Sequence, residues 1–363
     1  MIKKFKPLSL IAVLLIVTLL AACSSAPASD NSASPSSDNS APPSSEQSAP
    51  SLDAESSSAS VPDTDPTPEC QHSYSSEITK KPTATVKGSI TYTCSLCGDK
   101  YSEALPTEIK ILAVGNSFSS DGMEYLWNVL RDAGVEKVTL GNLYIGGCSV
   151  DKHWSNAQSG EAAYSYRKNT YGLWTSRTDS LQTALSEEEW DFITVQQVSN
   201  YSGKHDTLGN LHNLVDYLNK NKTNPDAKLY WHMTWAYDTN STHSGFAAYG
   251  KNQLTMYNAI VSTVKDTVLK ETLISGCIPA GTTIQNLRTT HLEDSLTRDG
   301  YHLSYDFGRY AAALTWMTAL TGISPEEVDW VPSGYSRVAT YETMVDDAVI
   351  SAISSPDKIT PQS

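Results

Sequence analysis

The stretch IKILAVGNSFS, residues 109–119, decides the fold class of this protein. Its first six residues form an apolar run with a single lysine, which is typical of a strand buried in the middle of a sheet. Gly115 breaks this run, and residues that favour turns follow it. Apolar side chains then recur at helical spacing over residues 123–130. A buried strand that leads through a short turn into a helix is typical of α/β proteins.

The sequence after this stretch repeats the alternation of strand and helix. Further strand candidates are residues 138–143, 192–196, 229–234 and 273–278, and helical patterns cover residues 181–188, 208–218, 249–269 and 305–320. Apolar strands that alternate with helices imply a parallel sheet covered by helices on both faces. We therefore expect functional residues just beyond the carboxyl ends of the strands.

The composition excludes one broad class of function. The 363 residues include 40 Asp and Glu against 26 Lys and Arg, which gives a formal net charge of −14. Because phosphate contacts need clustered Lys and Arg, we expect no nucleic-acid partner. The chain is 39 % apolar and contains 8 Trp and 19 Tyr, which is enough to form a sizeable core.

The first 22 residues are predicted to be an export signal. Three lysines precede an apolar run at residues 8–20, which is too short for a comfortable membrane span. The sequence Leu20-Ala21-Ala22-Cys23 resembles the bacterial lipobox, in which the cysteine is diacylated and becomes the new N-terminus. The alternative is an ordinary signal peptide with a chance cysteine. We expect an exported lipoprotein that is anchored to the cell membrane through lipidated Cys23 and faces outside.

A linker is predicted to follow, so that residues 23–69 hold the lipidated cysteine and a Ser/Pro-rich stretch. This stretch contains no Lys or Arg and almost no large apolar residue. Because such a composition cannot form a core, we expect an extended, disordered stalk without catalytic residues.

Residues 70–106 are predicted to form a small module with a metal-binding pattern. Cys70 and His72 precede Cys94 and Cys97, and the alternating residues 83–93 between them predict a hairpin with strands at 83–88 and 89–93. Cys-x-x-Cys-Gly suits a knuckle that holds two thiolates, and Cys70 and His72 would complete a Cys₃His site for structural zinc. The module resembles the short ribbon-like repeats of secreted Firmicutes proteins. The alternative is a disulfide with one free thiol, since export exposes thiols to oxidation.

Two segments far apart in the sequence carry the residue types of a serine hydrolase. Ser117 follows the first strand on a turn that would expose its hydroxyl, although it could simply cap the next helix. Asp299 precedes His302 by three residues, on a loop before the last helix. Such an aspartate can orient the imidazole, which can then take the proton from a serine.

These segments make the chain resemble the SGNH hydrolases, a superfamily of serine esterases and lipases. The first block, usually G-D-S, reads G-N-S at residues 115–117, and the last block, D-x-x-H, is present at residues 299–302. The resemblance implies a flavodoxin-like, three-layer α/β/α parallel sheet over residues 107–325, followed by a C-terminal extension at residues 326–363. It also implies a catalytic triad made of Ser117, His302 and Asp299.

The resemblance also implies an oxyanion hole. Gly146 or Gly147 matches the glycine of the second block, and we favour the N–H of Gly147 beside that of Ser117. The usual third block, G-x-N-D, is missing, and residues 195–199 read V-Q-Q-V-S. We expect the side chain of Gln196 to take over the role of the asparagine. Gln197 is the alternative, because successive side chains of a strand point to opposite faces and the register can differ by one residue.

A closer resemblance is to an uncharacterised bacterial branch of SGNH-like proteins. The shared motifs are G-N-S-F-S at residues 115–119, a strand-end Gln followed by Ser at residues 196–199, W-x-x-T-W-A at residues 231–236 and R-D-G-x-H-L-S at residues 298–304. These motifs support the fold and the catalytic Ser and His, but they do not identify the substrate.

Several residues near the predicted strand ends have two interpretations. Trp231, Trp235 and Tyr237 could stack on a sugar ring of the substrate, or they could pack in the core or at the rim. His153 could line the cleft, although a structural role is favoured. Arg298 could bind an acidic group of the substrate or merely pair with Asp294.

The expected function is an exported, membrane-tethered serine esterase that hydrolyses acyl esters, mainly O-acetyl esters on carbohydrate or cell-wall glycan. The substrate class rests on analogy more than on geometry. His302 would take the proton of Ser117, and water would then hydrolyse the acyl-enzyme without a cofactor. Alternatives from other classes are a non-catalytic glycan-binding surface lipoprotein and a structural surface spacer.

Overall fold

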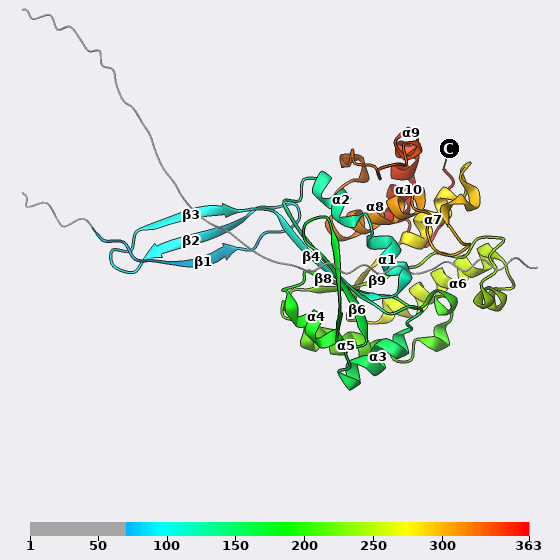
Figure 1. The fold of residues 1–363 in the computed structure, drawn as a ribbon, viewed down its shortest axis with the longest axis horizontal. Coiled ribbons are helices and arrows are strands. Elements are labelled where there is room, and N and C mark those ends of the chain that lie inside the picture. The colour runs from blue at the N-terminus through cyan, green and yellow to red at the C-terminus, as the bar shows by residue number, and fades with distance from the viewer. Residues whose placement is uncertain (1–69, 363) are drawn as a thin grey trace, which may run out of the picture. The chain divides into compact units, whose positions relative to one another are not determined.

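A computed structural model of the protein describes residues 70–362 (Figure 1). These residues belong to one compact unit. The predicted signal at residues 1–22, the lipidated Cys23 and the linker up to residue 69 lie outside the described residues. Among the helices that the structure describes, none combines the length and the apolar character needed to cross a bilayer.

A seven-stranded sheet in the order β10-β9-β8-β4-β5-β6-β7 forms the centre of the α/β domain. Its strands are β4 (Glu108–Gly115), β5 (Lys137–Tyr144), β6 (Tyr164–Asn169), β7 (Trp174–Asp179), β8 (Phe192–Val195), β9 (Lys228–His232) and β10 (Ile274–Ile278). The five strands from β10 to β5 pair in parallel, which confirms the predicted parallel sheet. β6 and β7 add an antiparallel hairpin at one edge, which was not predicted because its sequence is largely polar.

Helices cover both faces of this sheet and give a three-layer α/β/α arrangement (Figure 1). They are α1 (Ser117–Met123), α2 (Leu126–Asp132), α3 (Val150–Ser159), α4 (Leu181–Glu187), α5 (Leu211–Asn221), α6 (Gln253–Asp266), α7 (Ala280–Leu287), α8 (Phe307–Thr321), α9 (Arg337–Thr340) and α10 (Glu342–Ser354). Short 3₁₀ helices are η1 (Ser199–Tyr201), η2 (His205–Thr207), η3 (Ser244–Tyr249), η4 (Val268–Lys270), η5 (Glu293–Leu296) and η6 (Pro325–Glu327). α1, α2, α7 and α10 contact α8 on one face, and α3, α4 and α5 pack together on the other.

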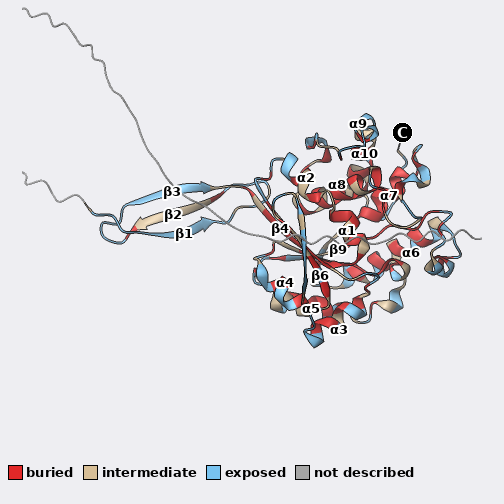
Figure 2. Cartoon of the chain, viewed as in Figure 1, coloured by how far each residue is buried: buried red, intermediate tan, exposed pale blue. Residues whose placement is uncertain are grey.

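The core of the domain follows the hydrophobic pattern of the sequence. Figure 2 shows buried residues concentrated in the central strands and in α8. All residues of β4 from Ile111 onward are buried, and Trp316 of α8 has no exposed surface. α10, which lies in the predicted C-terminal extension, buries Val345 and Ala348 and packs on α7 and α8. This part of the chain therefore contributes to the same core.

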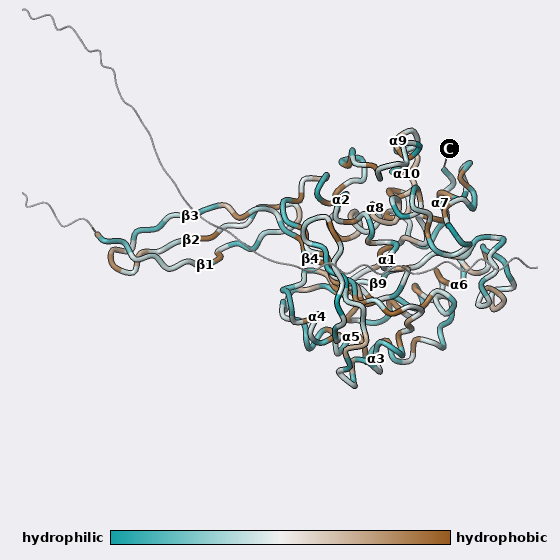
Figure 3. The backbone as a smooth tube through the Cα atoms, in the orientation of Figure 1, coloured by the Kyte–Doolittle hydropathy of each residue, from teal (hydrophilic) through white to brown (hydrophobic). Residues whose placement is uncertain are grey.

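The small module is a three-stranded antiparallel sheet in the order β1-β2-β3. Its strands are β1 (Tyr74–Lys80), β2 (Gly88–Cys94) and β3 (Lys100–Leu105). The predicted strand at residues 83–88 is wrong, because Thr83 and Val86 close a turn through a backbone hydrogen bond of 2.9 Å. Figure 3 shows that the module is mostly hydrophilic or neutral, whereas the strands and helices of the α/β domain contain many hydrophobic residues.

Candidate active site

Ser117 stands where β4 ends and α1 begins. Asn116 caps α1, because its side chain accepts the backbone N–H of Phe118 at 3.0 Å. Gly115 is required at the turn, since a Cβ at this position would collide with the side chain of Ser119. Ser117 itself is not the cap, and its hydroxyl remains free to take part in chemistry. The site therefore lies beyond the carboxyl end of a central parallel strand.

The structure brings Ser117, His302 and Asp299 together as a connected triad. His302 Nε2 lies 2.8 Å from Ser117 Oγ, and His302 Nδ1 lies 2.7 Å from Asp299 Oδ2. The other oxygen of Asp299 accepts the backbone N–H groups of His302 at 2.7 Å and Tyr301 at 3.2 Å. A nucleophile, a base and a group that orients the base are thus within hydrogen-bond reach of one another.

The surroundings of Asp299 favour its charged form. Burial opposes ionisation, but the hydrogen bonds from the backbone and ring of His302 outweigh it, so the pKa of Asp299 is held below its ordinary value. The carboxylate is therefore ionised at neutral pH and can stabilise a positive charge on His302 when the imidazole takes a proton.

Asp121 fixes the loop that carries the histidine. Its side chain is 1 % exposed and binds Arg298 at 3.0 Å, Arg309 at 2.7 Å and the backbone N–H of Leu303 at 2.9 Å. Arg298 is thus paired with this carboxylate, and the interpretation that it pairs with Asp294 is wrong. The sequence interpretation missed Asp121, although it follows Ser117 by four residues on α1 and so lies on the same helix face.

Gln196 and Gln197 do not reach the cleft, which corrects the expected oxyanion donor. The Nε2 of Gln196 donates to Asn116 at 2.8 Å, and its Oε1 lies 3.0 Å from the Nδ1 of His232. Gln197 donates to the backbone oxygen of Thr207 at 2.9 Å. Both glutamines are 1 % exposed. β8 ends at Val195, so both glutamines lie at the start of the loop that follows this strand. Their amides bind buried partners there instead of facing the substrate.

Asn200 lines the cleft together with Ser117, Gly146, Gly147 and His302. It belongs to η1, which follows β8 after a short connection. Gly147 has a φ of +63°, a conformation that glycine adopts without strain. The sequence contained a signal for Asn200, since it is the third residue of Val-Ser-Asn, where G-x-N-D has its asparagine. The cleft has a volume of about 490 Å³.

The aromatic residues expected at the mouth of the cleft lie in the core. Trp231, Trp235 and Tyr237 are at most 2 % exposed. Trp235 stacks on Phe118 with ring centroids 4.5 Å apart and donates to the backbone oxygen of Tyr301 at 2.7 Å. Trp235 therefore packs beneath the segments that carry Ser117 and His302. Because all three aromatic side chains are buried, the sugar-stacking interpretation is wrong for them.

His153 is also remote from the cleft. Its side chain is fully buried, and its Nδ1 lies 3.0 Å from the hydroxyl of Tyr164. Burial lowers the pKa of His153 to about 3, so the ring is neutral. The favoured structural interpretation fits this position. Tyr144, His243 and Tyr301 line the cleft instead.

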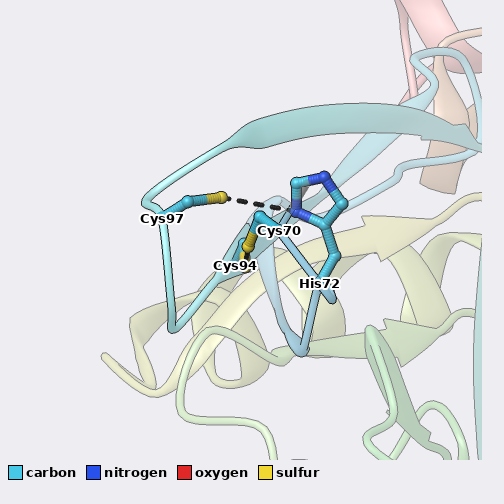
Figure 4. A group of neighbouring side chains, drawn as sticks. All are labelled: Cys70, His72, Cys94 and Cys97. Atoms are coloured by element: carbon cyan, nitrogen blue, oxygen red, sulfur yellow. Dashed lines mark hydrogen bonds between the residues drawn. The ribbon is translucent and has the colours of Figure 1, made fainter. Parts of the chain in front are cut away.

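The structure also brings together the four residues of the predicted metal pattern. The ligand atoms of Cys70, His72, Cys94 and Cys97 all lie within 4.8 Å of one another (Figure 4). None of the four is among the residues that line the catalytic cleft. The cysteines in the described range, these three included, are free thiols.

Comparison with known proteins shows the family of the chain. No curated protein matches it. A solved DUF4886 family protein from Bacteroides uniformis is 40 % identical, covers 70 % of this chain and 97 % of that chain, and superposes with a TM-score of 0.66. Axe2, an acetylxylan esterase from Geobacillus stearothermophilus, is 12 % identical over 62 % of this chain and 97 % of its own, with a TM-score of 0.41. A likeness this distant supports no conclusion about activity. The family model described as "Domain of unknown function (DUF4886)" matches residues 110–347, and the chain belongs to this family.

Proposed function

We propose that this protein is a serine ester hydrolase of the SGNH type. The observation that carries the proposal is the unbroken chain of short hydrogen bonds from Ser117 through His302 to Asp299. Ser117 and His302 line a cleft together with Gly147 and Asn200, which carry a backbone N–H and an amide side chain. This combination is suited to acyl transfer.

The first half of the reaction transfers the acyl group to Ser117. His302 Nε2 takes the proton of Ser117 as Oγ attacks the ester carbonyl, and a tetrahedral intermediate forms. The ionised Asp299 stabilises the imidazolium. His302 then returns the proton to the alcohol oxygen as the bond between the carbonyl carbon and that oxygen breaks. A water molecule repeats the sequence on the acyl-enzyme and releases the acid.

The negative oxygen of the intermediate needs donors that already face it. We assign this role to the backbone N–H groups of Ser117 and Gly147 and to the side-chain amide of Asn200, all of which belong to residues that line the cleft. Preorganised donors of this kind supply a large part of the catalysis of acyl transfer. Asn200 replaces Gln196 in this assignment, because the amide of Gln196 is buried and already paired.

The lining of the cleft favours a polar alcohol as the leaving group. Tyr144, Asn200, His243 and Tyr301 offer hydroxyl, amide and imidazole groups beside aromatic surface. Hydroxyl-rich molecules such as acylated carbohydrates match this mixture of donors and aromatic rings. We therefore propose O-acyl, chiefly O-acetyl, esters of glycans as substrates.

Hydrolysis of p-nitrophenyl acetate and release of acetate from acetylated oligosaccharides test this function. The wild type should hydrolyse both, and Ser117→Ala should abolish both activities while the protein stays folded. Ser165→Ala is the matched control, because this exposed serine of β6 should be dispensable. Equal activity of wild type and Ser117→Ala would contradict the proposal.

The cellular location that we propose rests on the N-terminal sequence. Cys23 in its lipobox-like context supports export and lipid anchoring. Cys23→Ser should leave an unlipidated precursor and abolish membrane association. Continued partition of this variant into detergent, with the uncleaved signal excluded as the anchor, would contradict the lipid anchor.

A further inference from the structure

We propose that Cys70, His72, Cys94 and Cys97 form a zinc site that holds the small module of residues 70–105 together. The sulfur atoms of Cys70 and Cys94 are 3.9 Å apart, and the Sγ of Cys97 lies 3.3 Å from the Nδ1 of His72. Figure 4 shows these side chains facing one another, with the Cys97 sulfur directed at the imidazole. Three thiols and one imidazole are a donor set that structural zinc prefers.

The spacing of the donors agrees with tetrahedral coordination. In a tetrahedral site, zinc bonds of about 2.3 Å to sulfur and about 2.0–2.1 Å to nitrogen place two sulfurs about 3.8 Å apart and a sulfur and a nitrogen about 3.5 Å apart. The separations of 3.9 Å between the sulfurs of Cys70 and Cys94 and 3.3 Å between Cys97 and His72 are close to these values, and all donor atoms lie within 4.8 Å of one another. Zinc binding would therefore need only small side-chain movements.

The turn between β2 and β3 is shaped as a metal-binding knuckle. The backbone N–H of Leu96 points at the sulfur of Cys94 at 3.4 Å, an arrangement that favours a thiolate. The N–H of Gly98 donates to the backbone oxygen of Cys94 at 3.0 Å, and Gly98 has a φ of +79°. A residue with a side chain is strained at that φ, so the glycine lets the chain return toward β3 with both cysteines on the same side.

The module has little else to stabilise it. Every residue of β1 is exposed, and β2 buries only its end residues Gly88 and Cys94. Its tyrosines stack at the surface, with the rings of Tyr92 and Tyr101 4.7 Å apart. A short sheet without an apolar core is marginal in water, and a metal supplies the missing free energy directly.

The four donors of the cluster favour a zinc site over a disulfide. A disulfide would use two of the three thiols and leave one thiol and the imidazole of His72 without a role. In the structure, all four donors converge, including the imidazole. The site is also separate from catalysis, because none of its residues lines the cleft around Ser117.

Metal analysis of the whole protein, purified under reducing conditions with zinc, tests the proposal. We expect about one zinc ion per chain, and cobalt in its place should give the intense visible absorption of tetrahedral thiolate coordination. Cys94→Ser and Cys97→Ser should lose the metal and become sensitive to proteolysis within residues 70–105. Ester hydrolysis by these variants should stay within about twofold of wild type.

Cys277→Ala is the matched control, because Cys277 is a free cysteine in β10 of the α/β domain and should not affect zinc content. Failure of the reduced wild type to bind zinc or cobalt would overturn the proposal without relying on any variant. It would also be overturned if Cys94→Ser kept its full zinc content. A Cys70–Cys94 disulfide in the metal-free exported protein would overturn it in favour of oxidation.

Discussion

The α/β domain and the small module are held together by different physics. In the domain, β4 buries all residues from Ile111 to Gly115, and α8 is buried along most of its length. In the module, β1 is exposed at every position. Burial of apolar surface stabilises the domain, whereas in our proposal a metal ion on four donor atoms stabilises the module. In one chain, the hydrophobic pattern can therefore specify the α/β domain, while the spacing of metal ligands specifies the small module.

The comparison extends to function. The domain places a nucleophile, a base and a carboxylate beyond the end of a buried strand, where packing can hold them within hydrogen-bond distance. The module has no residue in that cleft. Variants of the domain should therefore alter chemistry without altering metal content, and variants of the cluster should do the reverse.

The largest effect is expected for the nucleophile. Ser117→Ala should lower kcat for p-nitrophenyl acetate by roughly 10⁴-fold or more, because removal of the attacking hydroxyl abolishes the acyl-enzyme. Its zinc content should equal that of the wild type. A loss of zinc in this variant would show that the two regions are coupled, and the comparison would fail.

The second largest effect is expected for Asn200, which lines the cleft, and not for Gln196, which lies beneath it. Asn200→Ala should lower kcat by roughly 10²–10³-fold with little change in KM, the usual loss for one oxyanion donor. Gln196→Ala is the paired variant and should act mainly on stability, because it removes a buried hydrogen bond to Asn116 and leaves the Nδ1 of His232 without a partner. The reverse outcome would be a normal kcat in Asn200→Ala and a strongly lowered kcat in a stable Gln196→Ala. It would show that Gln196 is the oxyanion donor, as first expected from the sequence.

A smaller effect is expected for the carboxylate that positions the histidine loop. Asp121→Asn should lower kcat by roughly 10- to 10²-fold, because Arg298 and Arg309 lose their shared anion and His302 shifts from its place. Asp216→Asn, at a half-buried carboxylate of α5 that pairs with Lys220, is the control and should have normal kinetics. A pH–rate profile separates positioning from unfolding, since a displaced His302 should alter the pH dependence of the folded enzyme. An unchanged kcat and profile would show that the loop is held by other contacts.

The parallel strands could be predicted because their apolar runs are continuous and local. β4, β5, β8, β9 and β10 all lie at the predicted places. β6 and β7 escaped prediction because an edge hairpin can be polar and still pair. The hairpin predicted at residues 83–93 is correct for residues 89–93, which lie in β2, but residues 83–86 form a turn and not a strand.

The triad could be predicted because its spacing lies within two short motifs. The roles of Trp235 and Asn200 could not be derived in the same way, because they depend on contacts between distant segments. Trp235 packs on Phe118, and Asn200 lines the cleft from η1, outside the predicted strand. Strand ends in the sequence identify which loops approach the site, but not which side chains of those loops face it.

The smallest effect is expected for Asp346, a buried carboxylate that lowers the stability of the domain when it is charged. Asp346 of α10 is 7 % exposed, and burial, together with repulsion from Glu342 and other carboxylates, raises its pKa from 3.8 to about 7. Because the folded state binds this proton more tightly than the unfolded chain, the stability from Asp346 is complete below about pH 4 and is lost as the pH rises through about 7. Asp346→Asn should therefore raise the free energy of unfolding by about 1–2 kcal/mol near pH 8 and by little near pH 4.

Urea denaturation at the two pH values measures this difference, with Glu327→Gln, at an exposed carboxylate elsewhere in the chain, as the control. The control should change the free energy of unfolding by less than about 0.5 kcal/mol. An Asp346→Asn variant that gained the same stability at both pH values would show that its effect does not come from the carboxylate charge.

Covalent labelling tests most directly the claim that the domain carries the chemistry on Ser117 and the module carries none. The wild type and Cys94→Ser would be incubated with a fluorophosphonate that reacts with activated serines, and the adduct located by intact mass and peptide mapping. We predict one adduct per chain on Ser117 in both proteins and none in Ser117→Ala. An adduct on another serine, or none on a folded wild type, would contradict the account.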